Sequence, residues 1–171
     1  VAAGGRSPGP SLTVRPATAA DCDRVKELAL YFWDETEVNC FGREYDVLTC
    51  PAFLACDGGD VVGMASYAVE PGWDALVLVM LNVLPACQDR DGGGALIAAL
   101  VEEAARLERA RILVATSNDD LLALAFYQRH GFHLVELIPG VIAQHHGGEL
   151  VGFSGIPVRA EIHLERPVPT S

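Results

Sequence analysis

LNVLPACQDRDGGGAL, residues 81–96, joins an apolar strand to a helix through a polar loop with three consecutive glycines. The N–H groups in the first turn of a helix have no partner within the helix and carry a partial positive charge, so they can bind a phosphate. Gly92, Gly93 and Gly94 lack the Cβ atom that would block its approach. A lone glycine cluster is more often only a flexible turn, so the interpretation depends on the flanking sequence.

Helices and strands alternate after this loop. Apolar residues recur at helical spacing from Ala95 to Leu107, and the β-branched run Arg111–Thr116 predicts a buried strand. A second helix is predicted from Leu121 to Arg129, where Gly131 provides its C-terminal signal, and a strand from Phe132 to Leu137 follows. This order indicates a mixed α/β fold.

The segments before the loop predict strands with two helices among them. In chain order we expect a strand at Leu12–Arg15, a helix around Val25–Phe32, a short second helix at Gly42–Leu48, strands at Ala52–Cys56 and Val61–Val69, and a central strand at Ala75–Val83. At the other end, Pro139–Gly155 is predicted to be a loop and Arg159–Glu165 a strand that closes the sheet. The His145–His146 pair in that loop indicates a solvated segment more than a metal site, because adjacent histidines rarely bind one ion without a further ligand.

Two spaced motifs resemble those of a known family. The first, L-x-V-x-P-x-x-Q-x-R-G-x-G-x-A-L, is matched by Leu81, Val83, Pro85, Gln88, Arg90, Gly93, Ala95 and Leu96. The second, N-x-x-A-x-x-F-Y-x-x-x-G-F, is matched by Ala123, Phe126, Tyr127, Gly131 and Phe132. With both motifs in order, the chain resembles the GNAT acyltransferases, which transfer an acyl group from acyl-coenzyme A, usually to an amine. The resemblance covers Leu12 to Glu165.

The resemblance implies a fold, a reaction and a co-substrate. We expect an α/β (α+β) domain over residues 12–171, with a mixed, largely antiparallel central sheet flanked by helices on both faces, preceded by a disordered arm over residues 1–11. The implied reaction is transfer of an acetyl group from acetyl-CoA, or another acyl-CoA, to a primary amine of a small molecule or peptide, by direct attack in a ternary complex and without a metal. The alternative is a catalytically degenerate domain that binds acyl-CoA or a protein partner without turnover.

The resemblance also implies site residues. The strands corresponding to Leu76–Leu84 and Ile112–Thr116 would part, and the pantetheine arm would lie between them. Tyr127 would be the general acid, since a phenol with a pKa near 10 can protonate a thiolate of similar basicity. Trp33 lies in the region that shapes the acceptor pocket, although packing in the core or at its rim is the simpler role for it. Coenzyme binding is assigned to Leu81, Asn82, Val83, Gln88, Asp89, Arg90, Asp91, Gly92, Gly93, Gly94, Ala95, Asp120, Ala123 and Phe126.

Several positions depart from the family pattern. Asp89 and Asp91 stand where the family has glycine in the loop. Asp120 stands where the family has an asparagine just before the second helix. Carboxylates beside a pyrophosphate repel it, with Arg90 as a partial offset, so weak coenzyme binding is expected. Val77 occupies the position of the usual glutamate base, which leaves the base unassigned, with Asp34, Glu35, Glu37 and Asp74 as unranked candidates.

Composition restricts the partners. The formal net charge of −11 and the pI near 4.7 argue against nucleic acid, because phosphate neutralisation needs clustered Lys and Arg. No uncharged apolar run approaches the roughly 20 residues that span a bilayer. The five cysteines, Cys22, Cys40, Cys50, Cys56 and Cys87, form no C-x-x-C pair, so reduced thiols in a cytoplasmic protein are expected. A nucleotide-binding domain is the weaker rival, since neither G-x-x-x-x-G-K-[ST] nor G-x-G-x-x-G is present, and the sequence leaves open whether the chain forms a homodimer.

Overall fold

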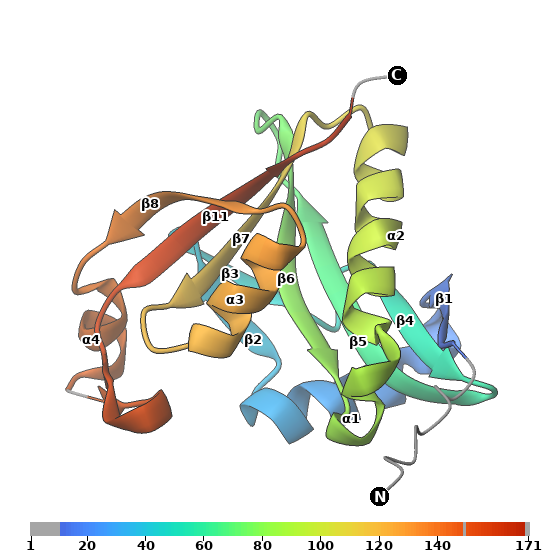
Figure 1. Cartoon of the computed structure of the whole chain (residues 1–171), viewed down its shortest axis with the longest axis horizontal. Coiled ribbons are helices and arrows are strands. Elements are labelled where there is room, and N and C mark those ends of the chain that lie inside the picture. The colour runs from blue at the N-terminus through green and yellow to red at the C-terminus, as the bar shows by residue number, and fades with distance from the viewer. Residues whose placement is uncertain (1–10, 149, 170–171) are drawn as a thin grey trace, which may run out of the picture.

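A seven-stranded sheet forms the centre of the molecule (Figure 1). The computed structural model describes residues 11–148 and 150–169, so the arm expected over residues 1–11 lies, except for Ser11, outside the described residues. All neighbouring strands are antiparallel except β6 and β7, which confirms the predicted mixed, largely antiparallel sheet. In spatial order the strands are β1 (Thr13–Pro16), β4 (Ala52–Asp57), β5 (Asp60–Val69), β6 (Ala75–Val83), β7 (Arg111–Ser117), β11 (Glu161–Pro167) and β8 (His133–Ile138).

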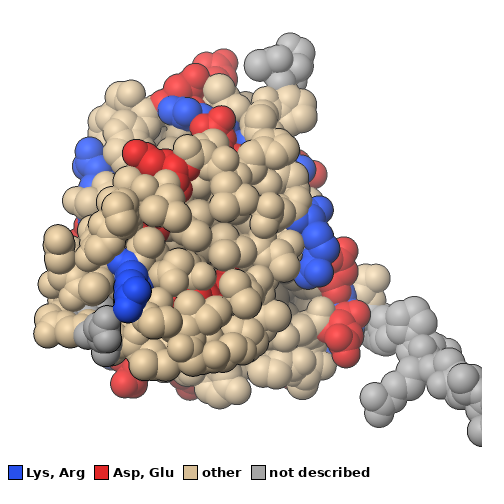
Figure 2. Space-filling model, turned by 60° about the vertical axis from the view of Figure 1, so that its left-hand side comes forward, with Lys and Arg blue, Asp and Glu red and all other residues tan. Residues whose placement is uncertain are grey.

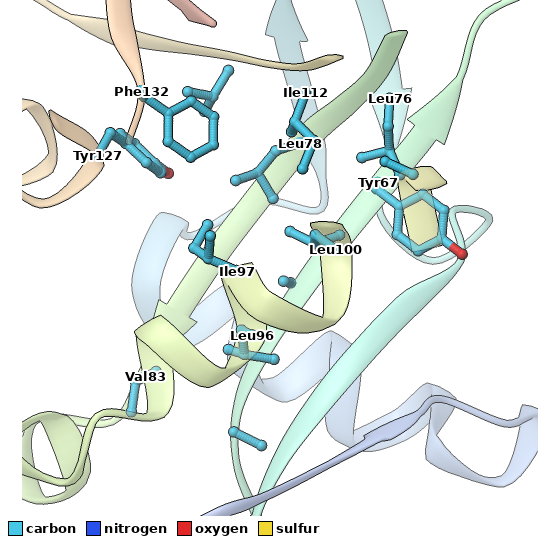
Figure 3. Packing of buried hydrophobic residues seen from close by; sticks show 14 of the residues in the cluster. Tyr67, Leu76, Leu78, Val83, Leu96, Ile97, Leu100, Ile112, Tyr127 and Phe132 are labelled. Carbon is cyan, nitrogen blue, oxygen red and sulfur yellow. The ribbon is translucent and has the colours of Figure 1, made fainter. Parts of the chain in front are cut away.

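Helices cover both faces of this sheet, as predicted. The helices α2 (Gly92–Arg106) and α3 (Leu121–Arg129) lie on the face turned to the viewer in Figure 1 and enclose a core that Figure 3 shows from close by. The helix α1 (Cys22–Trp33), which follows a short 3₁₀ turn at Ala19–Asp21, packs on the opposite face through Val25, Leu28 and Ala29. Side chains alternate along the strands, so the central strands β4, β5 and β6 supply both cores.

The short second helix predicted at Gly42–Leu48 is wrong. This segment belongs to a β-hairpin of β2 (Glu37–Cys40) and β3 (Arg43–Asp46), and Phe41 and Gly42 form its turn with φ angles of 54° and 68°. Tyr45 and Val47 are buried two residues apart, which is the period of a strand and not of a helix. The hairpin therefore covers the same face of the sheet as α1.

The loop predicted at Pro139–Gly155 contains short regular elements. These are α4 (Val141–His146), β9 (Leu150–Val151) and a 3₁₀ turn at Phe153–Gly155, and β9 pairs with β10 (Pro157–Val158). Within the described ranges, no group of His, Cys, Asp or Glu side chains has the arrangement of a metal site. The segment packs against the end of β7, because the Asn118 amide bonds Pro157 O, Arg159 N and Ala160 N at 2.8–2.9 Å.

The far edge of the sheet is β8. Leu134, Val135 and Leu137 on this strand are exposed, although they are apolar. The side that carries β8 and α4 comes forward in Figure 2, where uncharged residues cover most of the surface. An edge strand with apolar side chains can pair with a strand of another chain. Among the described helices, none combines the length and apolar character needed to cross a bilayer.

Candidate active site

The sheet opens between its two parallel strands. The pairing of β6 with β7 runs from Ala75–Arg111 to Leu78–Val114 and goes no further, although both strands continue. A β-bulge in β6 lies at this point, because Ser66 pairs with Met80 and Tyr67 with Leu78, which leaves Val79 without a partner in β5. A bulge bends its strand and ends regular pairing. The sequence therefore builds a gap beyond Leu78, where the resemblance places the acyl-coenzyme.

Backbone groups of β6 face this gap. The Leu84 N–H donates to Val62 O at 2.8 Å, so residue 84 directs its backbone toward β5. Because backbone groups alternate in direction along a strand, Leu81 and Val83 direct theirs away from β5 and into the gap. The Gln88 amide donates to Val83 O at 3.0 Å, which ties the following turn to the strand. The N–H groups of Leu81 and Val83 are thus available to an extended ligand where the strand has lost its neighbour.

The first turn of α2 carries unpaired N–H groups next to the gap. Among the described residues, the N–H groups of Gly92, Gly93 and Gly94 have no backbone partner, whereas the Ala95 N–H donates to Asp91 O at 3.0 Å. The glycines themselves allow close packing. A Cβ built on Gly92 would lie 2.7 Å from Leu12, and one on Gly93 would lie 2.9 Å from the Phe126 ring.

Charges around this turn reduce its attraction for an anion. Asp91 adopts a left-handed conformation with a φ of 55°, and its carboxylate lies so close to Gly94 that a Cβ there would clash with it. Asp89 is exposed on the preceding turn. Arg90 forms a bidentate ion pair with Asp57 at 2.5 and 2.9 Å, and this pair keeps the Asp57 pKa below its usual value. The positive charge that sequence analysis set against the two aspartates is therefore shared with the β4–β5 turn.

Asp120 caps α3 on the other side of the gap. Its carboxylate accepts the Ala123 N–H at 3.0 Å and the Thr116 hydroxyl at 3.4 Å. A carboxylate can fill the N-cap role of asparagine, so the departure from the family motif preserves the helix start. Ala123 and Phe126 follow on this helix, and Phe126 contacts the glycine turn of α2. The two motifs thus meet in space.

Tyr127 is buried beneath these elements. Its ring packs edge-to-face against Phe126 and Phe132 at centroid distances of 5.4 and 5.3 Å, and its hydroxyl points away from α3 toward the interior (Figure 3). Burial, and secondarily the charge of Asp120, raise the pKa of Tyr127 well above its ordinary value. Its hydroxyl has no hydrogen-bond partner in the described part of the chain. A phenol in this state retains its proton and can donate it.

Trp33 lies on the opposite face of β6. With the Asn82 amide oriented so that both of its ends are satisfied, its oxygen accepts the Trp33 indole N–H at 2.9 Å and its nitrogen donates to Leu81 O at 3.0 Å. Trp33 is 47% exposed, so its ring lies at a rim and not in the core. The contact places the end of α1 beside the gap.

The position of the missing base is apolar and closed. Val77 is fully buried in the core under α1. Of the four carboxylates considered from the sequence, Asp74 accepts the Ala110 N–H at 3.1 Å at the end of β6 remote from the gap. The other three are exposed, with Asp34 and Glu35 between α1 and β2 and Glu37 at the start of β2.

A buried group that no sequence motif indicated lies on the same face of the sheet. His163 of β11 lies between Glu161 and Glu136 and is buried. These residues come from two strands that are distant in the sequence, and only the pairing of β11 with β8 brings them together. The alternation around His163 predicted a strand, but a single sequence carries no signal for the partner across it.

Comparisons with known proteins agree with this geometry. The sequence model of the acetyltransferase (GNAT) family matches residues 20–132. The chain therefore belongs to the GNAT family of acetyltransferases, as the two motifs predicted. Over 116 residues it is 27% identical to the uncharacterized protein YdhI of Bacillus subtilis, covering 66% of this chain and 70% of YdhI.

Solved structures show the same fold. An IAA acetyltransferase from Bacillus cereus superposes with a TM-score of 0.71 at 21% identity, over 92% of this chain and 99% of that one. An acetyltransferase of Bacillus subtilis, solved in complex with CoA, superposes with a TM-score of 0.70 at 16% identity, over 93% and 100% of the two chains. These likenesses confirm the architecture.

Proposed function

We propose that this protein transfers the acetyl group of acetyl-CoA to a primary amine of a small molecule or peptide. The observation that carries the proposal is the gap beyond Leu78, which is bordered by the backbone of β6, the unpaired N–H groups of α2 and the phenol of Tyr127. Family membership and the CoA complex of a structural neighbour support acetyl-CoA as the co-substrate.

Each border of the gap has a role in the proposal. The backbone of Leu81 and Val83 binds the amides of the pantetheine arm as an added strand would, and polarises the thioester carbonyl. The N–H groups of Gly92–Gly94 bind the pyrophosphate. Tyr127 protonates the departing thiolate.

Direct attack by the amine is consistent with two of the five cysteines, Cys40 and Cys50. Burial raises the pKa of Cys40 to about 12 and that of Cys50 to about 11, so neither thiol ionises readily near neutral pH. A covalent acyl-enzyme would need a thiolate or an activated hydroxyl at the gap. We therefore propose a ternary complex in which the amine attacks the thioester without an intermediate on the protein.

Two observations favour the second candidate, a domain that binds acyl-CoA without turnover. The Asp91 carboxylate lies beside the first turn of α2, and Val77 cannot accept a proton. The first observation predicts weak coenzyme affinity and the second predicts slow chemistry. Neither removes the phenol or the gap, so we place this candidate after the enzyme.

Calorimetry and an amine screen separate the two candidates. Binding of acetyl-CoA is measured first, and thiol release is then followed with tyramine, spermidine, lysine amide and an alanyl peptide. The screen uses Cys22→Ser protein, because Cys22 is exposed and would react with a thiol reagent. Binding together with amine-dependent thiol release supports the enzyme. Binding without release from any acceptor supports the second candidate, and no binding at millimolar acetyl-CoA would exclude both.

A further inference from the structure

The reaction proposed above has a proton requirement that Val77 leaves unmet. An alkylammonium ion loses two protons when it becomes an amide nitrogen, since the C–N bond forms with the lone pair that the first deprotonation frees. One proton ends on the sulfur of the coenzyme, where the C–S bond has broken, and the other is released. A base must take this proton, and a route must carry it to solvent. This inference rests on the proposed function and concerns the residues that serve it.

Three hydrogen-bonded side chains form a row from the interior to the surface. His163 Nε2 lies 2.5 Å from Glu161 Oε1, and His163 Nδ1 lies 3.1 Å from Glu136 Oε2. The side chains of Glu161 and His163 are 13% and 10% exposed, whereas that of Glu136 is 60% exposed. The imidazole can accept a proton at one nitrogen and release one at the other. This row of side chains therefore connects the enclosed carboxylate of Glu161 to water.

The cluster lies beside the gap on the face that α1 and the β2–β3 hairpin cover. In the pairing of β11 with β7, His163 is opposite Ala115 and Glu161 is opposite Ser117. Ala115 and Ser117 lie on β7 beyond Val114, the last residue paired with β6. Directly paired residues of antiparallel strands share a face. His163 and Glu161 are therefore one strand away from the gap. Ala115, which carries only a methyl group, lies between His163 and the gap, and Ser117 lies between Glu161 and the gap.

The hairpin fixes Glu161 and leaves one of its oxygens available. The Phe41 N–H donates to Glu161 Oε1 at 3.1 Å, and the Phe41 ring packs on the His163 imidazole at a centroid distance of 4.3 Å. Oε1 is thus engaged by Phe41 and His163. The second oxygen, Oε2, has no hydrogen-bond partner in the described part of the chain.

We propose that Glu161 is the general base of this enzyme and that His163 and Glu136 carry the proton to solvent. The N–H bond of the acceptor ammonium breaks and an O–H bond forms at Glu161. The freed lone pair then attacks the thioester carbonyl, the C–S bond breaks, and Tyr127 protonates the sulfur. The second proton of the nitrogen restores Tyr127, while the first leaves from Glu161 through the imidazole to Glu136.

Few other ionisable groups near Glu161 can contribute to the pH dependence of the rate. The ionisable groups facing Glu161 are His163 on its own strand, Glu136 on β8, and the Cys40 thiol on β2, whose pKa burial and then Glu161 raise to about 12. Asp119 follows β7 and is held by the Ser117 hydroxyl and the Phe153 N–H. Arg43 and Tyr45 of the hairpin both bond Glu70 and not Glu161.

The test compares Glu161→Gln with Glu165→Gln. Glutamine keeps an oxygen for the Phe41 N–H but cannot take a proton. Glu165 lies on the same strand, where its partner is Arg111, so the same change there is the matched control. For Glu161→Gln we expect kcat/KM with tyramine to fall about 100-fold at pH 7 and to recover as pH rises and the acceptor itself becomes neutral. An arylamine, which has no proton to lose before attack at pH 7, should react at a rate close to that of wild type.

Each outcome decides the inference. A loss confined to ammonium acceptors and reversed at high pH, with unchanged acetyl-CoA affinity and a wild-type profile for Glu165→Gln, supports it. A loss of equal size at every pH and with both acceptors shows a structural role and overturns it, as does a wild-type rate. If wild-type protein binds acetyl-CoA but acetylates none of the amines, the proposed function fails, and this inference fails with it.

Discussion

Tyr127 is buried, and its hydroxyl is not engaged by the described part of the chain. A tyrosine that served only packing would lose little by becoming phenylalanine, because the ring contacts with Phe126 and Phe132 would remain. The hydroxyl is therefore the part of the side chain to test.

We expect Tyr127→Phe to lower kcat by at least about 100-fold and to leave the dissociation constant of acetyl-CoA within about two-fold of wild type. The melting temperature should stay the same or rise slightly, since no hydrogen bond is lost. Steady-state kinetics, calorimetry and thermal unfolding measure the three quantities. Equal losses of turnover and affinity would make Tyr127 a packing residue.

Asp91 affects both conformation and charge. Its left-handed backbone is strained for most residues but not for glycine, and its carboxylate lies beside the turn that would bind a pyrophosphate. Removing the side chain should therefore favour both the folded state and the bound state. The two effects can be separated, because asparagine also tolerates this conformation and differs from aspartate mainly in charge.

For Asp91→Gly we expect acetyl-CoA to bind roughly two- to ten-fold more tightly, with a weaker salt dependence than wild type. Asp91→Asn should reproduce the part of this gain that comes from charge. Calorimetric titrations at two ionic strengths measure it. An unchanged dissociation constant in both variants would place the pyrophosphate elsewhere. The analogous change Gly93→Val is less informative, since its Cβ would meet Phe126.

At the scale of elements, the prediction from sequence succeeded where a long apolar run or clear end signals mark an element and failed where tertiary contacts decide. The strand Ala75–Val83 has the predicted bounds because it is a nearly continuous apolar run, and the helix Leu121–Arg129 has them because Asp120 caps its start and Gly131 follows its end. The segment Gly42–Leu48 does not, because a strand of four residues gives too short a pattern to distinguish from a helix turn. Its identity depends on pairing with β2 and on burial of Tyr45.

The candidate site follows the same rule. Tyr127 and the glycine turn were predicted because both lie within contiguous motifs, and their roles stay predictions. The Glu161–His163–Glu136 cluster was missed, because strand pairing and not sequence spacing brings its members together. Arg90 was set against the two aspartates, but no pattern in the sequence indicates that Asp57 in a distant turn shares its charge.

Asn118 gives a test of how the segment after β8 is held. Its side chain satisfies backbone groups of Pro157, Arg159 and Ala160 that would otherwise need water. In Asn118→Ala we expect faster hydrogen exchange over residues 150–160 and a loss of about 1–3 kcal/mol in the free energy of unfolding. Exchange in β6 should not change. Protection of the segment equal to that of wild type would show that other contacts hold it.

At the scale of the whole molecule, the buried thiols and phenols make stability sensitive to alkaline pH. Burial raises the pKa of Cys40 and Tyr67 to about 12 and that of Cys50 to about 11, and it also raises the pKa values of Tyr45 and Tyr127. In the unfolded chain these groups ionise near their ordinary pKa values of 9.0 for cysteine and 10.0 for tyrosine. The folded state therefore binds more protons than the unfolded state in this range.

The sign of the pH effect follows from this difference. A group with a raised pKa in the folded state contributes stability that is fully present below its unfolded pKa and is lost as pH rises through its folded pKa. We expect the free energy of unfolding to be constant between pH 7 and 8 and to fall steadily from about pH 9 to 12. Urea unfolding at pH 8 and 11 measures the change. In Cys50→Ser the decrease should be smaller, and a decrease that begins below pH 8 would contradict this assignment.

The short pairing between β6 and β7 divides the backbone of the sheet into two blocks, β1–β4–β5–β6 and β7–β11–β8, joined along four residue pairs. An extended ligand that lies in the gap and forms hydrogen bonds with both β6 and β7 would join the two blocks and stabilise the sheet. At a coenzyme concentration 100 times its dissociation constant, mass action alone would add about 2.7 kcal/mol to the folded state. The metabolic supply of acetyl-CoA would then set how long each molecule survives proteolysis, as well as how fast it works.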